Sequence, residues 1–492
     1  MIERVLVIDL EVSGAQVREI GACLGEERGR WTDLFAAREA LRGMAGRARG
    51  QAGHNAHAHD LPILERLWPD HPLLDLPLVD TLLWSPIIRP ERPYHRLVKD
   101  RALVREKGND PLSDALGARE LLADVLAWQT SAPKPLAAFA RAAVSAQLGP
   151  ARWAGPPRPP PAELLPALLA SLEGHACLTQ AALLTEWLRD KPADAYPLAC
   201  LAAWLPLGPG SVLPPWVWRT FPVVRELQTL LRETDCSRVD CAWCAKTRSA
   251  EDQLARWFPG FRSFRAEPAL ADGRSAQAVV VQAGLENHSL FAILPTGGGK
   301  SIGFQVPAFA RYARTGALTV VISPLQSLMK DQVDALRQRT DNPHAFALHG
   351  GLDLLSRQEV LRAIREGEAG LLYLSPEQLR NPGARAALQT RQIGCWVIDE
   401  AHCMAEWGHD FRTDYWYAPR FIAELARQQG VTVPAIACFT ATAQARVRQQ
   451  IEQRIEETCR RSLQLFQAVT ERSNISLRVL GTQPRQRQAQ LQ

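Results

Sequence analysis

The chain lacks any stretch typical of a membrane span or a secretory signal. Its first twelve residues, MIERVLVIDLEV, carry charges at Glu3, Arg4 and Asp9, which does not fit the uncharged core of a signal peptide. The longest uncharged run, residues 195–218, is long enough to cross a bilayer, but five prolines and two glycines interrupt it. We therefore expect a buried or docking segment there, and a protein without membrane contact.

The sequence also lacks a strong bias toward one sign of charge. The net charge is +5, and residues 446–492 alone hold nine arginines against four glutamates, so the remainder sums to zero. Any argument for nucleic-acid binding must therefore rest on local sites. Ten cysteines without a secretory signal predict a reducing, cytoplasmic (nucleoid-associated) location, where thiols stay free or bind metal.

Composition along the 492 residues divides the chain into several parts. Fourteen prolines between Pro150 and Pro222 mark an irregular middle region. After it, short apolar runs alternate with helix-like stretches, which predicts a parallel sheet covered on both faces. We expect an α/β fold with these boundaries: an α/β domain at 1–130, a proline-rich helical region at 131–250, a second α/β lobe at 251–470, and the start of a further lobe at 471–492.

A glycine-rich segment, LPTGGGKSIGFQ (294–305), follows the first apolar run of that lobe. Glycines let backbone N–H groups close around phosphates at a helix N-terminus. Lys300 is expected to reach the β/γ-phosphates of ATP, although Leu294 stands where the usual P-loop spacing has its first glycine. The candidate cradle comprises Thr296, Gly297, Gly298, Gly299, Lys300 and Ser301, with Ser301 on the Mg²⁺ ion.

Two acids end a later apolar strand. CWVIDEAHC (395–403) places Asp399 and Glu400 about a hundred residues beyond Lys300. An acid in this place can hold Mg²⁺, mostly through water, and its neighbour can orient or deprotonate the attacking water. Together with the glycine-rich segment, this pair predicts ATP hydrolysis.

Six motifs in this lobe, taken in order, resemble the first motor lobe of the RecQ-family DNA helicases. The motifs are LPTGGGKS, SPLQSLMKDQ (323–332), LSPEQL (374–379), DEAH (399–402), WGHDFR (407–412) and FTATA (439–443). The resemblance covers roughly residues 251–492 and implies a RecA-like lobe of a superfamily 2 helicase that translocates 3′ to 5′ on single-stranded DNA. It also implies adenine contacts from Phe261, Arg265 and Gln277, with eleven residues between the last two where the family spacing is short.

The same resemblance implies how this lobe contacts DNA. Ser327 and Lys330 would touch phosphates of the tracking strand, and His402 with Thr440 and Thr442 would couple the ATP state to lobe movement. Aromatic rings stack on bases without sequence preference, at about 1–3 kcal/mol per base. The loop expected to stack and to report DNA to Glu400 comprises Trp407, His409, Phe411 and Arg412.

In the RecQ family the stretch ERSNISLRVL (471–480) opens the second motor lobe, which supplies the arginine finger. That lobe forms the other wall of the ATP cleft. We therefore expect this 492-residue polypeptide to bind ATP, to hydrolyse it poorly and not to unwind DNA.

Acidic residues near the N-terminus predict a second metal site. VIDLEVSG places Asp9 and Glu11 on one face of a strand, where two carboxylates can share the cations used in two-metal phosphodiester cleavage. GHNAHAHDLPIL (53–64) adds Asp60, and NDPLSDA (109–115) adds Asp114 at a helix start. Across residues 1–128 these acids resemble the DEDD-type 3′–5′ exonucleases, which implies a ribonuclease-H-like fold and a pair of Mg²⁺ or Mn²⁺ ions.

One departure from that family concerns the general base. The position five residues before the last acid, commonly histidine, is Asn109, which cannot take a proton from water. The tyrosine variant of the family would need tyrosine at 110, where the chain has Asp110. Three outcomes stay open: a slow nuclease, a nuclease using His95 or another histidine, and a module that only binds DNA ends. His59 is expected to pack.

Cys236, Cys241 and Cys244 form a C-x4-C-x2-C motif. The spacing suits tetrahedral zinc, with a fourth ligand from Cys200, Cys177 or His175, or alternatively an iron–sulfur cluster. Reduced structural thiols are the remaining alternative.

The leading interpretation is an ATP-dependent DNA helicase of RecQ type with an exonuclease-like module, acting in DNA repair, recombination or defence. Its partners would be single-stranded and partly double-stranded DNA. One rival is a DNA-end binding protein whose motor lobe is an ATP switch, and another is a nuclease in which ATP use regulates access.

Overall fold

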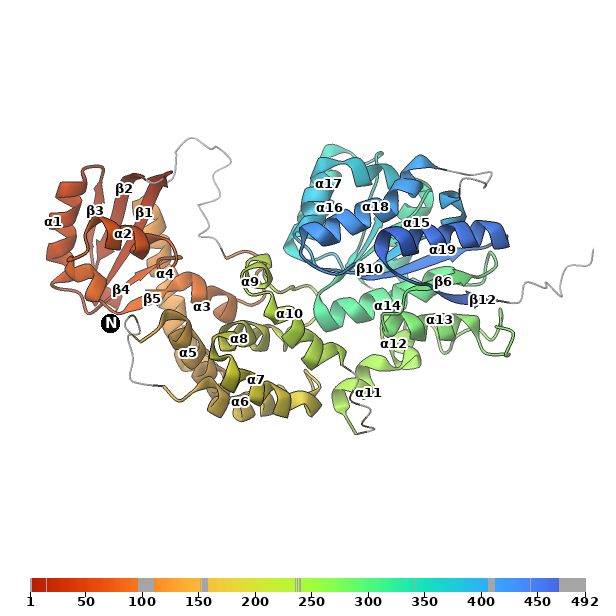
Figure 1. The fold of residues 1–492 in the computed structure, drawn as a ribbon, viewed down its shortest axis with the longest axis horizontal. Coiled ribbons are helices and arrows are strands. Elements are labelled where there is room, and N and C mark those ends of the chain that lie inside the picture. The colour runs from red at the N-terminus through yellow and green to blue at the C-terminus, as the bar shows by residue number, and fades with distance from the viewer. Residues whose placement is uncertain are drawn as a thin grey trace, which may run out of the picture.

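The structure, a computed structural model, describes residues 2–14, 16–95, 110–150, 152, 158–234, 236, 238, 240–340, 342–405, 412–442 and 444–468. Two α/β lobes lie at the ends of an elongated molecule, with a helical region between them (Figure 1). The N-terminal lobe has a five-stranded sheet and the C-terminal lobe a seven-stranded one. The expected α/β class is confirmed.

The N-terminal sheet is mixed, with the order β3-β2-β1-β4-β5. Its first three strands pair antiparallel, and β4 and β5 run parallel to β1. The strands are β1 (Val5–Ser13), β2 (Gln16–Leu24), β3 (Glu27–Trp31), β4 (Gly50–Gly53) and β5 (Leu78–Asp80). The helices are α1 (Leu34–Ala45), α2 (Asp60–Leu67), α3 (Thr81–Ile88) and α4 (Pro111–Ser131), with short 3-10 turns η1 (Ile2–Arg4) and η2 (Pro72–Asp75).

The start of α4 lies directly on β2 because of one glycine. A Cβ at Gly21 would lie only 2.2 Å from the amide nitrogen of Leu112, so any other residue would push the helix away. Pro111 opens the helix, where its missing N–H is not needed. The first turn of α4, which carries Asp114, is thereby held against the strand pair that carries Asp9.

A helical region follows, with a hydrophobic core that is continuous with that of the first lobe. One buried cluster runs from Leu6 on β1 to Leu231, and all ten residues of α8 are buried, which confirms the buried segment expected there. The helices are α5 (Lys134–Leu148), α6 (Pro161–Ala170), α7 (Ala181–Asp190), α8 (Ala195–Trp204), α9 (Pro215–Thr220), α10 (Val223–Gln228), the π-helical η5 (Thr229–Glu233), α11 (Ala242–Arg248) and α12 (Ala250–Trp257), with 3-10 turns η3 (Leu178–Gln180) and η4 (Pro192–Asp194).

The C-terminal sheet is wholly parallel, with the order β12-β6-β11-β10-β7-β9-β8. Buried clusters cover both of its faces, as the apolar runs predicted. The strands are β6 (Leu290–Ile293), β7 (Leu318–Ile322), β8 (Ala345–Leu348), β9 (Leu371–Leu374), β10 (Ile393–Ile398), β11 (Ala435–Thr440) and β12 (Gln464–Gln467). The helices are α13 (Ala276–Leu285), α14 (Lys300–Thr315), α15 (Gln326–Thr340), α16 (Leu354–Glu366), α17 (Pro382–Gln389), α18 (Thr413–Gln428) and α19 (Ala445–Cys459), with η6 (Pro376–Arg380) and η7 (Ala401–Met404).

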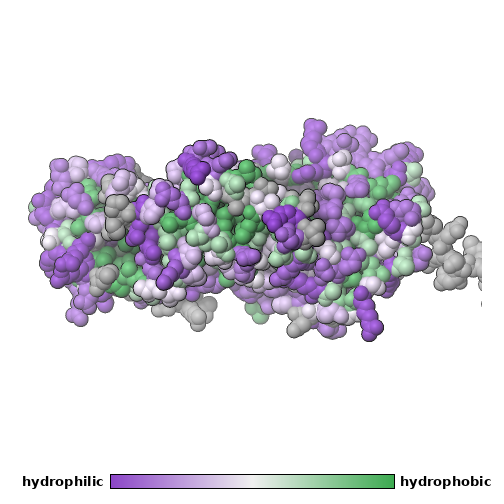
Figure 2. All heavy atoms as spheres, turned by 90° about the horizontal axis from the view of Figure 1, so that it is seen from below, coloured by the Kyte–Doolittle hydropathy of each residue, from purple (hydrophilic) through white to green (hydrophobic). Residues whose placement is uncertain are grey.

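The surface is largely hydrophilic on the side that Figure 2 shows, with smaller apolar areas between the polar ones. Within the ranges that the structure describes, no helix combines the length and apolar character that a bilayer crossing requires.

Candidate ATP and metal sites

The phosphate cradle lies between the end of β6 and the start of α14. Gly297 and Gly299 take left-handed backbone angles, with φ of +81° and +74°. A Cβ on Gly299 would lie 1.9 Å from the side-chain amide nitrogen of Gln277, so a glycine is required there. Leu294, at the place of the missing P-loop glycine, is fully buried, and its N–H donates to the carbonyl of Thr440 at 3.0 Å. Leu294 therefore packs in the core of the sheet and is not part of the phosphate cradle.

The acids at the end of β10 face this cradle. Lys300 Nζ donates to Glu400 Oε1 at 2.8 Å, which joins two segments a hundred residues apart. Glu400 has a left-handed backbone, with φ of +47°, and its N–H donates to Asp399 Oδ1 at 3.0 Å. Burial, followed by the charge of Glu400, raises the pKa of Asp399 to about 6, while Lys300 lowers it. A buried carboxyl with a strongly perturbed pKa and a specific charge partner marks a candidate functional site.

The residues expected to bind adenine lie beside the cradle despite the long spacing between them. The Arg265 N–H donates to Gln277 Oε1 at 3.1 Å, and its guanidinium donates to the Gly297 carbonyl at 2.7 Å. The intervening residues form a turn closed by a bridge between Ala269 and Ser275, which brings both ends of the insertion together. A pocket of about 340 Å³ is bounded by Phe261, Arg265, Gln277, Gly299, Ser301 and residues of α14 and α15.

A hydrogen-bonded chain links the DEAH segment to β11. His402 Nδ1 lies 2.9 Å from Thr440 Oγ1 and 3.3 Å from Glu400 Oε2. The Thr440 hydroxyl donates to the carbonyl of Thr442 at 2.9 Å. The side chains of His402 and Thr440 are therefore in contact, and Thr442 joins them through its backbone carbonyl.

The structure describes only some of the residues that were expected to contact DNA. Arg412 donates to the carbonyl of Pro324 at 3.2 Å, so it lies at the SPLQS motif. Ser327 and Lys330 are exposed on α15, close to that motif. Trp407, His409 and Phe411 lie outside the described residues, as does the stretch 471–480.

Four acids meet in the N-terminal lobe. Carboxylate oxygens of Asp9, Glu11 and Asp114 all lie within 4.8 Å of one another. Burial, followed by the charges of Asp60, Asp114 and Glu11, raises the pKa of Asp9 to about 8. Asp60 is almost fully buried, and its Oδ2 is a buried atom without a hydrogen-bond partner among the described residues. An unpaired buried carboxylate oxygen beside three acids fits a divalent cation.

His59 and His95 have different surroundings from those expected. The expectation that His59 packs is wrong, because its Nδ1 lies 2.8 Å from Asp60 Oδ1. His95, considered as a replacement base, pairs instead with Ser85 Oγ at 2.7 Å, and burial lowers its pKa to about 4. Asn109 lies outside the described residues.

Asp80, which was not predicted from the sequence, holds residues 55–57 in place. Its carboxylate accepts the N–H groups of Asn55, His57 and Leu82 at 2.9–3.0 Å. Burial raises its pKa to about 6. An aspartate directly before a helix start, as in VDTLLW, was the available signal for a cap, but its contacts to residues 55 and 57 depend on the pairing of β4 with β5.

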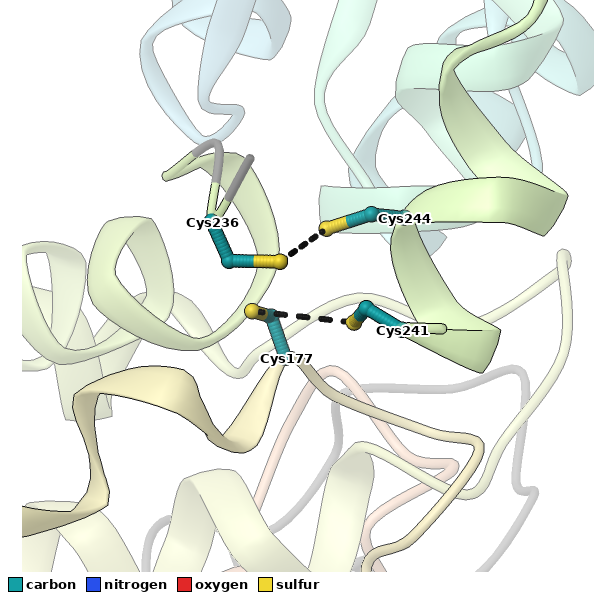
Figure 3. Close-up of side chains that lie close together, drawn as sticks. All are labelled: Cys177, Cys236, Cys241 and Cys244. Atoms are coloured by element: carbon teal, nitrogen blue, oxygen red, sulfur yellow. Dashed lines mark hydrogen bonds between the residues drawn. The ribbon is translucent and has the colours of Figure 1, made fainter. Parts of the chain in front are cut away.

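Cys177, from the helical region, lies beside the three cysteines of the C-x4-C-x2-C motif. The Sγ atoms of Cys177, Cys236, Cys241 and Cys244 all lie within 4.8 Å of one another. They converge from three segments of the chain (Figure 3). Cys200, another candidate, is buried in α8.

Comparison with known proteins agrees with this geometry. Residues 274–451 match the model of the DEAD/DEAH box helicase family. This segment is a DEAD/DEAH box helicase domain. The cradle at 294–301, the Lys300–Glu400 pair and the His402–Thr440 contact all lie within this helicase domain.

Curated relatives that match the chain are named as DNA helicases. The probable ATP-dependent DNA helicase RecS of Bacillus subtilis is 36% identical over 222 residues, covering 45% of this chain and 40% of the relative. The ATP-dependent DNA helicase RecQ of Synechocystis is 38% identical over 208 residues, covering 42% and 41%. The chain thus spans about two fifths of the length of these relatives. Among solved structures, the DUF1998 helicase MrfA bound to DNA aligns with 44% of this chain and 29% of its own, at 17% identity and a TM-score of 0.35.

Proposed function

We propose that this chain carries the ATP-binding motor lobe of a RecQ-type, ATP-dependent DNA helicase that moves 3′ to 5′ on single-stranded DNA in repair, recombination or defence. The supporting observation is the 2.8 Å pair between Lys300 and Glu400, which places a glycine-rich cradle against the DEAH acids. The similarity to relatives named RecS and RecQ supports the DNA substrate.

The residues around the cradle suggest how ATP would be used. Backbone N–H groups of residues 296–299 would hold the phosphates, and Phe261, Arg265 and Gln277 the adenine. Ser301 and Asp399 would hold Mg²⁺, which supplies charge neutralisation when bound. Lys300 would exchange Glu400 for phosphate oxygen, so Glu400 would become free to accept a proton from water.

DNA would cross the lobe near the start of α15. Ser327 and Lys330 would contact phosphates, and Arg412 would join them through its place beside Pro324. Contacts of this kind are electrostatic, so DNA affinity would fall as salt rises.

A nucleotide titration tests the proposal directly. A fluorescent ATP analogue with Mg²⁺ is expected to bind the chain and to lose at least about tenfold in affinity, or about 1.4 kcal/mol, in Lys300→Ala. Lys134→Ala is the matched control, because Lys134 is exposed on α5 outside the helicase domain. Equal binding by the Lys300→Ala variant and the wild type would remove the ATP site.

A second function is favoured by the acid cluster. We propose that the N-terminal lobe is a DEDD-type exonuclease-like module in which Asp9, Glu11, Asp60 and Asp114 would hold Mg²⁺ or Mn²⁺. Two observations support this: Oδ2 of Asp60 is buried and has no hydrogen-bond partner in the part of the chain that the structure describes, and the other three acids approach one another. The cations would supply an activated water and charge neutralisation, and His59 would hold Asp60 in place.

The rival is a DNA-end binding lobe that does not cut, with the helicase domain as an ATP switch. A nuclease assay on single-stranded and 3′-overhang DNA with Mg²⁺ or Mn²⁺ separates the two, run beside the Asp9→Ala/Glu11→Ala variant. Cleavage by wild type alone supports the nuclease. Cleavage by neither, together with retained binding to DNA ends, supports the rival, and equal cleavage by both excludes this acid site.

A further inference from the structure

Four thiols meet where the helical region joins the helicase domain. Cys177 precedes η3, Cys236 follows η5, and Cys241 and Cys244 lie at the start of α11 (Figure 3). Sγ of Cys236 lies 3.5 Å from that of Cys244, and Sγ of Cys177 lies 3.9 Å from that of Cys241. Both separations exceed the roughly 2.05 Å of a disulfide, so these are four free thiols sharing one small volume.

We propose that these four cysteines bind a single, tetrahedrally coordinated Zn²⁺ ion. Zinc–thiolate bonds of about 2.3 Å place the sulfurs of one tetrahedron about 3.8 Å apart. The separations of 3.5 and 3.9 Å lie on either side of that value, and no pair exceeds 4.8 Å. An iron–sulfur cluster distributes its thiolates over two or more iron atoms and needs a wider set. The distances between the sulfur atoms therefore fit a single metal ion and are too short for an iron–sulfur cluster.

The surroundings of the thiols hold the buried ligands, Cys177 and Cys244, in place, while Cys236 and Cys241 are partly exposed. The Cys177 N–H donates to the carbonyl of Leu231 at 2.7 Å, which fixes this distant ligand against η5. Trp243, between the two ligands of α11, is buried against Cys177 and Cys244. Its indole N–H donates to the carbonyl of Arg232 at 3.3 Å. Such outer contacts orient metal ligands and preserve their affinity.

The site also connects to the helix that starts the ATP cradle. The Arg232 guanidinium stacks on Trp243, with 4.3 Å to the ring centroid, and donates to the Arg314 carbonyl at 2.7 Å. Arg314 lies in the last turn of α14, which begins at Lys300. The metal would thus cross-link Cys177 to α11 and hold Arg232 at the C-terminal end of α14, the P-loop helix. This inference does not depend on the proposed helicase or nuclease activity.

Metal analysis of the purified 492-residue chain is the first test. We expect one zinc per chain, released when a mercurial reagent titrates the thiols and detected with a chromophoric chelator. Protein prepared with Co²⁺ in place of zinc should show strong thiolate-to-cobalt absorption with tetrahedral ligand-field bands. Iron with acid-labile sulfide, or a chain without metal, would overturn the proposal.

Substitutions show which sulfurs bind. Cys177→Ser and Cys241→Ser should each lose most of the zinc and the cobalt thiolate absorption. Cys200→Ala should keep both, because Cys200 is buried in α8 outside the cluster. Undiminished zinc in Cys177→Ser would overturn the four-cysteine assignment, and the wild-type metal count and cobalt spectrum decide the matter if a variant does not fold. Chelation of the metal should also speed hydrogen exchange at residues 228–233 and 313–316 relative to residues 371–374 of β9.

Discussion

At the scale of single residues, Gly299 shows how one absent side chain maintains the cradle. Gly297 and Gly299 both have positive φ, which costs other residues about 1–2 kcal/mol. A Cβ at Gly297 meets nothing within 4 Å, whereas one at Gly299 would collide with Gln277 Nε2. Gly299→Ala should therefore lower nucleotide affinity and the thermal midpoint more than Gly297→Ala does.

The collision itself can be separated from the backbone strain. Adding Gln277→Ala to Gly299→Ala removes the clashing amide and should restore part of the lost thermal stability, a coupling of about 0.5–3 kcal/mol in a double-mutant cycle. Additive effects of the two substitutions on the thermal midpoint would contradict this account.

Asp9 gives a second prediction at the residue scale. Four neighbouring carboxyls repel one another, and burial adds to the cost of charging Asp9. Because the pKa of Asp9 is raised to about 8, this carboxyl must take up a proton on folding at neutral pH, and Asp9→Asn removes that cost while it keeps the shape. The variant should therefore raise the thermal midpoint in the presence of a chelator and reduce the further rise produced by Mn²⁺. Glu39→Gln, on α1 outside the cluster, is the control. A wild-type midpoint indifferent to Mn²⁺ would argue against a metal site.

The sequence was enough to predict which motifs form the candidate sites, but not all the contacts that their residues make. Lys300 and Glu400 could be predicted to meet, because both follow apolar strands whose ends share one edge of a parallel sheet. The contact of His59 with Asp60, and of Asp80 with residues 55 and 57, could not. These contacts depend on loop conformation and on strand pairing across 23 and 25 positions.

At the scale of elements, prolines mark the starts of helices as well as the irregular parts of the middle region. Their density predicted an irregular helical region, and within it α6 and α9 begin at Pro161 and Pro215. Proline suits the first helical position because its φ is already helical and its missing N–H is not needed. The parallel sheet was easier to predict, because strands buried on both faces leave continuous apolar runs.

The P-loop helix α14 gives the prediction at this scale, because the helical region caps its C-terminus. Arg232 donates to the carbonyls of Ala313 and Arg314 at the end of α14, and to those of His175 and Leu205. Arg232→Met would leave these buried carbonyls unpaired, at about 1–3 kcal/mol each, and should lower the free energy of unfolding by at least about 2 kcal/mol.

A surface arginine of the same region is the matched control for that substitution. Arg219 is exposed and donates to one carbonyl, that of Gln389. Arg219→Met should therefore change the free energy of unfolding by less than about 0.5 kcal/mol in denaturant titrations. Equal effects of the two substitutions would show that the contacts to α14 contribute no stability.

At the scale of the whole molecule, the first sheet and the helical region share one core. The buried cluster extends without interruption from Leu6 to Leu231, and the Tyr196 hydroxyl of α8 donates to the Leu83 carbonyl of α3 at 2.9 Å. A boundary near residue 130 would cut through this cluster. Composition could not indicate this, because a shared core depends on which surfaces meet and not on where prolines concentrate.

Two fragments test whether the shared core makes one folding unit. Residues 1–131 would expose Trp84, Ile87 and Val125, buried side chains of the shared cluster, to water, at about 1.5–3 kcal/mol for each fully exposed side chain. Residues 1–248 retain the entire cluster. We expect the shorter fragment to bind a hydrophobic dye and lack a cooperative thermal transition, and the longer one to unfold in a single transition. A cooperative transition of equal midpoint in both fragments would show that the first lobe folds without the helices.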